Sequence, residues 1–325
     1  MTVDTPDAGA PLQRPIKWKK GLVRVLLSAI VLAIIFRAFS NEKIARGFAA
    51  VSFVPWILAL LAFIPLHVAS AAKWRTFLSL GDADLALRNA VRCHGLGLFA
   101  NLCLPSMIGG DVLRAGAAMR WAKSKAAVVL GSLLDRLGDA LGLGVIVLLA
   151  VGLAPRGIFG EVSPAGRALV AIALLLGGLV ALPLGFKILI GIRPIRRWPR
   201  KIARLMVESL RAFRRARRKP VRALLAFASG IATQTGLCLV NAALGRTMGL
   251  DMSPWLWLAL WPLAKLAAML PLSFGGIGVR EAAFAALASP FLSSDDTALL
   301  VAASLVWQTI LVSGGVLGGL TWKFG

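Results

Sequence analysis

Four polar residues recur at helical spacing inside an otherwise apolar stretch of the chain. Ser132, Asp135, Arg136 and Asp139 stand at positions i, i+3, i+4 and i+7 of the segment that begins at Ala126. On a helix they form one stripe, because residues three and four apart share a face. Charges are costly inside a bilayer, so such a stripe is typical of a ligand site, a proton path or an ion-pair lock between helices.

Two further groups of charged residues each follow a Gly-Gly pair. The first group is Gly109, Gly110, Asp111 and Arg114, and the second is Gly275, Gly276, Arg280 and Glu281. Backbone N–H groups at the start of a helix attract anions, and an arginine donates paired hydrogen bonds to phosphate oxygens. The carboxylates can hold an amine, carry protons or neutralise the arginines. We therefore predict a site for a phosphate-bearing substrate.

We expect both groups and the stripe around Asp135 to converge on one hydrated pocket, and we predict these residues as its substrate-binding set. The alternative is that Asp135, Arg136 and Asp139 only lock helices together by ion pairs. The sequence leaves both interpretations open. Asp135 lies ten residues beyond Lys125, or about 15 Å along a helix, which predicts a position near the membrane midplane.

Long apolar runs must position these charges. The chain has 325 residues, of which 58% are hydrophobic and only 16% charged, whereas soluble chains carry roughly a quarter charged residues. Several runs reach or approach the ~20 residues that span a bilayer. The clearest runs are 25–36, 55–66, 126–153, 168–190 and 299–320. This pattern excludes a soluble fold and predicts an all-α polytopic membrane protein.

Lys and Arg are distributed unequally among the connecting segments. Segments 1–24, 71–92, 112–125 and 193–222, with Lys323, hold 27 of the 37 Lys and Arg residues, and segments 37–47, 154–167 and 246–254 hold six. Cytoplasmic loops are enriched in Lys and Arg, so we predict the first set and both termini to be cytoplasmic.

Segment 193–222 alone carries thirteen Lys and Arg residues and one acidic residue, Glu208. Its apolar residues recur at helical spacing, which predicts an amphipathic helix whose basic face contacts anionic headgroups of the inner leaflet. The alternative is a solvated basic loop that only sets the topology. Because this charge lies between apolar runs, the net charge of +23 does not indicate a nucleic-acid partner.

Two apolar segments do not fit a simple span. Segment 94–110 begins and ends beside charges predicted to be cytoplasmic, and segment 254–292 begins and ends beside loops predicted to be outside. Each contains a proline, Pro105 or Pro271, that we predict as a hinge. Interrupted backbone at membrane depth is tolerated where protein or a water-filled cavity satisfies its polar groups. We therefore predict two re-entrant or broken-helix hairpins.

The two hairpins share a pattern. Residues 104–114 and 270–280 both read LPxxxGGxxxR, with five identities at one offset of 166 residues. We predict two inverted halves, 20–125 and 160–322, in a single transmembrane domain of 21–322 that follows a tail of 1–20. The domain would hold about six full spans and two hairpins. Interrupted segments at corresponding positions of inverted halves indicate a transport site.

The sequence gives little support for a metal site, a cofactor site or an enzyme active site. The three cysteines have no metal-ligand spacing, and His67 and His94 are too far apart in sequence to suggest a site, so we predict no metal and no cofactor. The sequence contains no phosphate-binding GxxxxGK[ST] loop, no GxSxG and no paired acid–base loop. We expect that the chain is not an enzyme.

Three segments resemble one known family. They are residues 101–115, 133–139 and 274–284, which contain both Gly-Gly motifs and the charged stripe. The chain is similar, over nearly its whole length, to the flippase-like transmembrane region of bacterial lysylphosphatidylglycerol synthases. The resemblance implies a multi-pass protein of the bacterial cytoplasmic (inner) membrane that moves a phospholipid or lipid-linked headgroup. Because the chain ends at Gly325, we do not expect the synthases' aminoacyl-transferase activity.

Our leading hypothesis is therefore a lipid flippase or scramblase whose partners are membrane lipids. A second hypothesis is a membrane-embedded enzyme, or an accessory subunit, of a pathway for phospholipids, hopanoids or glycolipids of the envelope. A third is a secondary transporter of small solutes. A partner enzyme of lipid modification, the lipid itself, the direction of transport and the oligomeric state are left open by the sequence.

Overall fold

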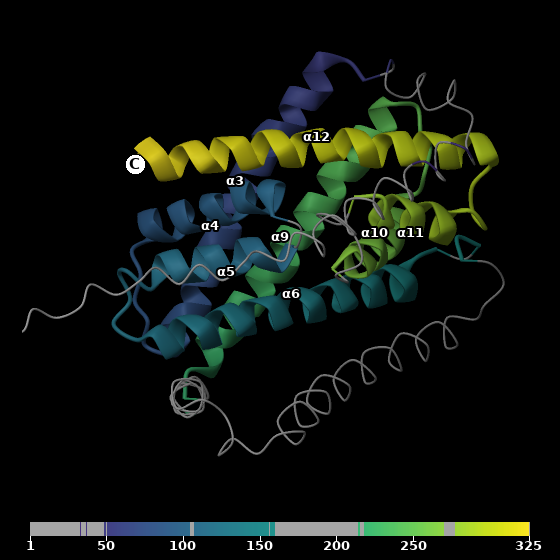
Figure 1. Ribbon diagram of the computed structural model, residues 1–325. Coiled ribbons are helices and arrows are strands. Elements are labelled where there is room, and N and C mark those ends of the chain that lie inside the picture. Colours follow the sequence, from purple (N-terminus) through teal and green to yellow (C-terminus); the bar gives the residue numbers. More distant parts are fainter. Residues whose placement is uncertain are drawn as a thin grey trace, which may run out of the picture.

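The computed structural model describes residues 51–104, 107–155, 157–159, 218–269 and 277–324, with the single positions 33, 37, 49 and 214. Within these ranges it contains the following helices (Figure 1): α3 (Phe53–Leu80), α4 (Leu87–Cys103), α5 (Met107–Ala118), α6 (Lys125–Leu153), α9 (Pro220–Thr247), α10 (Pro254–Ala268), α11 (Val279–Ala288) and α12 (Ser294–Phe324). The predicted all-α membrane fold is confirmed, because α3, α6, α9 and α12 are long and apolar enough to cross a membrane. The runs 25–36 and 168–190, the tail 1–20 and nearly all of segment 193–222 lie outside the described residues.

Local sequence signals explain where several helices begin. The side chain of Ser124 accepts a hydrogen bond from the Ala127 N–H, which caps the first turn of α6. Both α9 and α10 begin with a proline, whose missing N–H would have lacked a partner in the first turn anyway. At the other end of α3, the Gly81 N–H bonds to the carbonyl of Leu78 and stops the helix.

The described helices repeat one order along the chain: long, short, short, long. The first four, α3 to α6, correspond to the last four, α9 to α12. Helix α3 begins at Phe53 and α9 begins at Pro220, an interval of 167 residues. The same interval separates the starts of α4 and α10. The packing repeats as well: α4 packs on α12 as α10 packs on α6, and α3 and α9 pack on each other. This order extends the first repeat past residue 125 to include α6.

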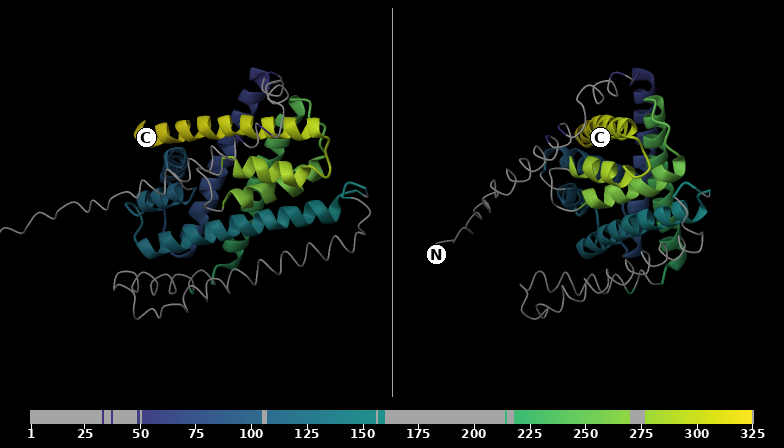
Figure 2. Two further views of the ribbon diagram at one scale, coloured as in Figure 1. Left: turned by 45° about the vertical axis from the view of Figure 1, so that its right-hand side comes forward. Right: turned by 90° about the vertical axis from the view of Figure 1, so that its right-hand side faces the viewer.

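Corresponding helices run in opposite directions. In Figure 1, α3 descends from the top while α9 ascends beside it, and α6 and α12 also run oppositely. Figure 2 shows α12 crossing the α3–α9 pair near its upper end and α6 crossing it near its lower end, with the short helices between α12 and α6. The molecule is therefore two interlocked halves, because α4 contacts the last helix and α10 contacts α6.

Both predicted interruptions separate helices. The first falls between Cys103 and Met107, and the second falls between Ala268 and Val279. Each of the four helices beside them is shorter than the ~20 residues of a full span. The prolines themselves, Pro105 and Pro271, lie outside the described residues.

Small residues let α4 and α12 approach closely. A Cβ atom added to Gly95 would lie 2.6 Å from the backbone oxygen of Gly318, and one added to Gly318 would lie 2.8 Å from the Cα of Gly95. No side chain larger than hydrogen fits at this crossing. The largest apolar core among the described residues contains the aromatic contacts of Phe284 with Trp257 and Trp261.

Candidate functional site

Three helices meet at one buried carboxylate. The Asp135 Oδ1 of α6 lies 2.9 Å from the Lys73 Nζ of α3, and the Asp135 Oδ2 accepts a 2.7 Å hydrogen bond from the Arg114 Nη2 of α5. The residue Asp135 is only 1% exposed, and both cations are equally hidden from solvent. One carboxylate therefore bridges two cations deep between helices, in the middle of the predicted stripe.

The network continues from Asp139 toward the second half of the molecule. The Lys73 Nζ also donates to the Asp139 Oδ1. The same oxygen accepts a 3.2 Å hydrogen bond from the Gln234 Nε2, and the Gln234 Oε1 accepts one of 2.6 Å from the Lys265 Nζ. Helices α3, α6, α9 and α10 are thereby joined through polar side chains, one from each.

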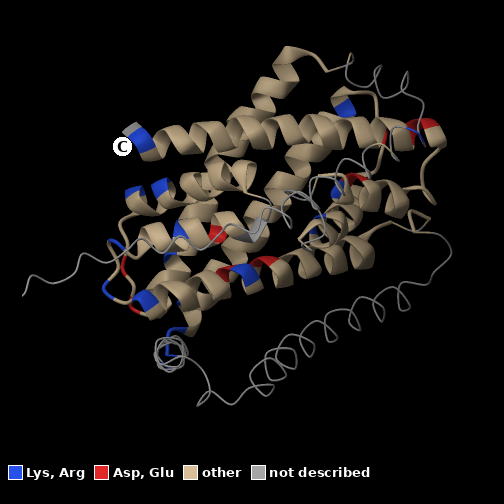
Figure 3. Ribbon diagram, in the orientation of Figure 1, with Lys and Arg blue, Asp and Glu red and all other residues tan. Residues whose placement is uncertain are grey.

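One side of the network reaches the surface. The Arg136 Nη2 donates a 2.6 Å hydrogen bond to the Asp111 Oδ1, which also lies 3.2 Å from the Arg114 Nε. The Arg136 side chain is 40% exposed and that of Asp111 is 22% exposed. Figure 3 shows charged positions on the neighbouring ribbons of α5 and α6. A ligand could reach Arg136 without displacing the buried pairs.

We call these residues the Asp135 cluster: Lys73, Asp111, Arg114, Asp135, Arg136, Asp139, Gln234 and Lys265. It contains four cationic side chains and three carboxylates, so one positive charge is left over. Taking ions out of water costs several kcal/mol each, and close pairing offsets that cost. The net positive charge of the cluster as a whole favours an anionic ligand.

Two histidines extend the cluster between α3 and α4. The His67 Nδ1 lies 3.0 Å from the His94 Nε2, and the His94 Nδ1 lies 3.2 Å from the Arg114 Nη1. Because a guanidinium only donates, the His94 Nδ1 must accept, which places the proton of a neutral His94 on Nε2 and directs it at His67. Nothing in the sequence indicated this contact, because the two histidines are 27 residues apart; the packing of α4 on α3 brings them together.

The second charged pair forms its own network. The Arg280 Nη2 donates to the Glu281 Oε1 at 2.6 Å, and this oxygen also accepts from the Ser304 hydroxyl at 3.0 Å. The Glu281 Oε2 accepts from the Gly278 N–H at 2.8 Å. A further 3.1 Å hydrogen bond joins Arg280 to the Gln308 side chain. Both members of the pair are buried.

The structure joins only part of the predicted set directly through hydrogen bonds and ion pairs. It brings Asp111, Arg114, Asp135, Arg136 and Asp139 together. Among the described residues, no hydrogen bond or ion pair connects these with Arg280 or Glu281. The reason is that Arg280 is held by α11 and α12, whereas Arg114 is held by α4 and α6.

The glycines of the first motif have a packing role. The Gly110 N–H donates a 3.0 Å hydrogen bond to the Asn101 side chain of α4, so the prediction that it is free to bind phosphate does not hold. A Cβ atom at Gly110 would collide with the Gly97 carbonyl, and one at Gly109 would lie 2.7 Å from Leu104. The corresponding pair, Gly275 and Gly276, lies outside the described residues.

Two cations that we assigned to cytoplasmic segments are buried. Lys73 was counted with segment 71–92, but α3 continues to Leu80 and carries Lys73 into the cluster. Arg114 was counted with segment 112–125 and lies within α5. Without these two, the segments predicted to be cytoplasmic still hold 25 Lys and Arg residues, whereas the segments predicted to be outside hold six. The only signal that could have identified Lys73 is its proximity to an apolar run.

Within the described part of the chain, His, Cys, Asp and Glu residues form no group of three or more that could hold a metal ion. The helices and the buried charges define the class of the protein: a polytopic membrane protein with a polar network between its spans. The family of the lysylphosphatidylglycerol synthase TM region matches residues 21–319, and the chain belongs to that family. A comparison with curated proteins found no match.

Proposed function

We propose that this protein moves a phospholipid or another lipid-linked phosphate headgroup across the cytoplasmic membrane, as a flippase or scramblase and without enzymatic activity. Membership of the family supports a lipid-related role in a membrane. The observation that carries the proposal is the Asp135 cluster, a charge network with an open side and one surplus cation. Intramembrane charges of this kind mark substrate pathways.

Arg136 is the residue that we assign to the headgroup phosphate. Its guanidinium can donate paired hydrogen bonds to two phosphate oxygens, for which it would release Asp111. The buried pair of Arg114 with Asp135 would hold α5 and α6 in place during this exchange. Beside them on α5, Val112 is 64% exposed and Leu113 is 44% exposed. Acyl chains can lie against these two side chains while the headgroup contacts the charges.

The repeat supports a route through the membrane. Helices of one half run opposite to their counterparts (Figure 1), as expected if the two halves are inverted in the bilayer. In this proposal the helix pairs α4–α5 and α10–α11 are re-entrant, both termini are cytoplasmic, and the halves open alternately to each leaflet.

The test is the substitution Arg136→Gln in proteoliposomes that contain a fluorescent phospholipid, with dithionite quenching as the measure of transbilayer movement. We expect the rate to fall roughly tenfold or more, because a charge-assisted hydrogen bond contributes about 1.5–3 kcal/mol. Stability should hardly change, since Arg136 is partly exposed. The matched control is Arg246→Gln, which removes an exposed arginine from the end of α9 and should leave the rate unchanged.

An unchanged rate in Arg136→Gln would contradict the proposed role of the cluster. A covalently altered lipid in the extract would instead favour an enzyme of an envelope-lipid pathway. Uptake of a soluble solute without lipid movement would favour a solute transporter.

A further inference from the structure

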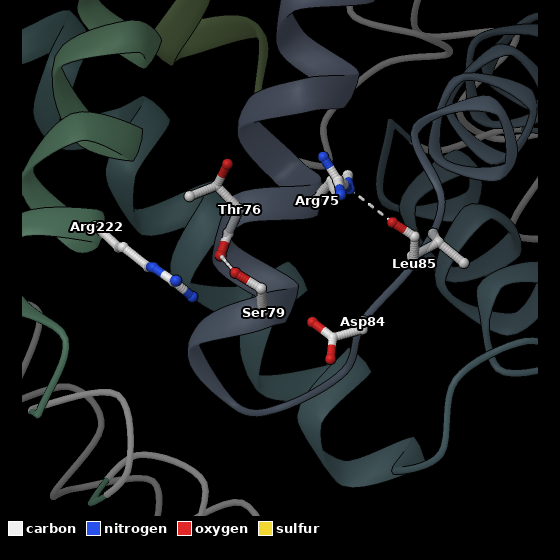
Figure 4. A pocket seen from close by; sticks show the side chains of 6 residues that line it. All are labelled: Arg75, Thr76, Ser79, Asp84, Leu85 and Arg222. Atoms are coloured by element: carbon white, nitrogen blue, oxygen red, sulfur yellow. Dashed lines mark hydrogen bonds between the residues drawn. The ribbon is translucent and has the colours of Figure 1, made fainter.

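A separate polar cavity lies at the end of α3. Its volume is about 320 Å³, near the lower end of the ~300–1,000 Å³ typical of small-molecule sites. Figure 4 shows the residues that line it: Arg75, Thr76, Ser79, Asp84, Leu85 and Arg222. They come from the last turns of α3, the turn that follows it, and the first turn of α9. None of them belongs to the Asp135 cluster.

The charged groups of this cavity are only partly used within the protein. The Arg75 Nε donates a 2.6 Å hydrogen bond to the Leu85 carbonyl, which fixes the side chain and leaves its terminal nitrogens as donors. Within the described residues, Arg222 and Asp84 have no hydrogen bond or ion pair through their side chains. In Figure 4 they extend toward Ser79 from opposite sides. Charges of both signs therefore line one cavity without neutralising each other.

A neighbouring ion pair fixes the walls of the cavity. The Lys219 Nζ lies 2.7 Å from the Asp82 Oδ1 and donates a 3.0 Å hydrogen bond to the Ser79 carbonyl. These contacts tie the start of α9 to the end of α3. The spacing between Arg75 and Arg222 is thus set by the backbone and needs no ligand to form.

The surface beside the cavity is apolar. On the first turns of α9, Val221 is 68% exposed, Leu224 is 65% exposed and Leu225 is 63% exposed. On a helix that crosses a membrane, such side chains contact acyl chains. A ligand that fits here has a polar head with charges of both signs and an apolar tail.

We propose that this cavity binds the headgroup of a zwitterionic phospholipid with a primary amine. The phosphate lies between Arg75 and Arg222, the ammonium group contacts Asp84, and the acyl chains follow the exposed leucines of α9. Paired arginines suit phosphate oxygens, and a carboxylate beside them selects for a cationic group. An anionic headgroup without an amine would leave the Asp84 carboxylate unpaired and close to negative charge.

The repeat makes this site one-sided. The interval of 167 residues between α3 and α9 places Pro55 at the position that corresponds to Arg222. Among the described residues, the position at the opposite end that corresponds to Arg222 therefore carries no arginine. The segments 71–92 and 193–222 are predicted to be cytoplasmic, so the lipid is taken from the inner leaflet. The site does not depend on the proposed transport function.

The test measures binding of short-chain lipids to the purified full-length protein in detergent, by calorimetry. Dihexanoyl-phosphatidylethanolamine should bind roughly tenfold more tightly than dihexanoyl-phosphatidylglycerol, because only the first can pair with Asp84. In Asp84→Asn this preference should disappear. In Arg222→Gln both lipids should bind about tenfold more weakly. The matched control is Arg218→Gln, which removes an exposed arginine that does not line the cavity and should behave as wild type.

Equal binding of the two lipids by the wild type, or a preference retained in Asp84→Asn, would overturn the proposal. Displacement of the lipid by inorganic phosphate at a similar concentration would also overturn it, since the site would then be one for free anions. Both test residues are exposed, so the variants should fold, and thermal unfolding checks this. A failure of the Arg136→Gln experiment would not affect this result, because Arg136 does not line the cavity.

Discussion

The two halves place different side chains at the same structural positions. Helix α6 begins at Lys125 and α12 begins at Ser294, an interval of 169 residues. This interval aligns Ser304 with Asp135, and the next turn aligns Gln308 with Asp139. In the first half, Arg114 of the preceding short helix bonds to Asp135. In the second half, Arg280 of the preceding short helix bonds to the Ser304 carbonyl and the Gln308 side chain.

The two halves differ in which helix supplies the buried carboxylate that pairs with the arginine. In the first half Arg114 faces the partly exposed Asp111 of its own helix, and its buried carboxylate partner comes from another helix and is shared with Lys73. In the second half the carboxylate comes from Glu281, the immediate neighbour of Arg280. The first network therefore depends on how α3, α5 and α6 are placed, whereas the ion pair of the second forms between neighbouring residues within one turn of α11. Among the described residues of the two networks, the substantially exposed charged side chains, Arg136 and Asp111, belong to the first, so we expect function there and anchoring in the second.

The largest effect should follow from removing the shared carboxylate. Asp135→Ala leaves Lys73 and Arg114 buried without their common partner, and breaking a buried ion pair costs about 3–5 kcal/mol. We expect this loss in the free energy of unfolding, measured by denaturant titration in mild detergent, together with loss of lipid movement. The counterpart Ser304→Ala loses one hydrogen bond to Glu281 and should cost only about 1 kcal/mol. Equal costs at the two positions would remove the distinction between the halves.

A smaller effect is expected from Glu281→Gln. Arg280 then loses its carboxylate but keeps the Ser304 carbonyl and the Gln308 side chain, so we expect a cost of about 1.5–3 kcal/mol. Thermal unfolding measures the loss. Lipid movement per folded molecule should remain at the wild-type rate, since this pair is assigned to anchoring. A transport defect in stable protein would show that the second half takes part in substrate handling.

The smallest of these changes tests the glycines of the first half. Gly110→Ala forces a methyl group against Asn101 and the Gly97 carbonyl, which should cost about 1–3 kcal/mol. The matched control is Gly144→Ala in α6, where no atom lies within 4 Å of the added methyl group. That variant should be neutral or more stable by up to about 1 kcal/mol. Thermal unfolding of both variants decides whether Gly110 is needed for close packing, and a neutral Gly110→Ala would argue against it.

Periodic features of the sequence predicted much of this arrangement. The stripe at Asp135 and Asp139 was predicted because residues on one helix face have a fixed spacing. The motif LPxxxGGxxxR occurs twice and predicted two interrupted segments, and the described helices end and begin again around both places.

Contacts between helices could not be predicted in this way. His67 and His94 meet only because α4 packs on α3, and Gln234 reaches Asp139 only because α9 packs on α6. Lys73 was assigned to a loop because hydropathy places the end of a helix poorly where charged residues begin. The hydrogen bonds of Arg280 to α12 could not be predicted either, because a linear motif does not contain its neighbours on that helix.

The exchange of helices between halves also fixes an order of events during biosynthesis. Helix α4 packs along α12, the last helix of the chain, and the two backbones touch at Gly95 and Gly318. Chains are made from the N-terminus, so the surface of α4 stays uncovered in the membrane until synthesis is almost complete. The ion pairs among α3, α5 and α6 can close earlier, which shields their charges from lipid while the nascent protein waits for its final span.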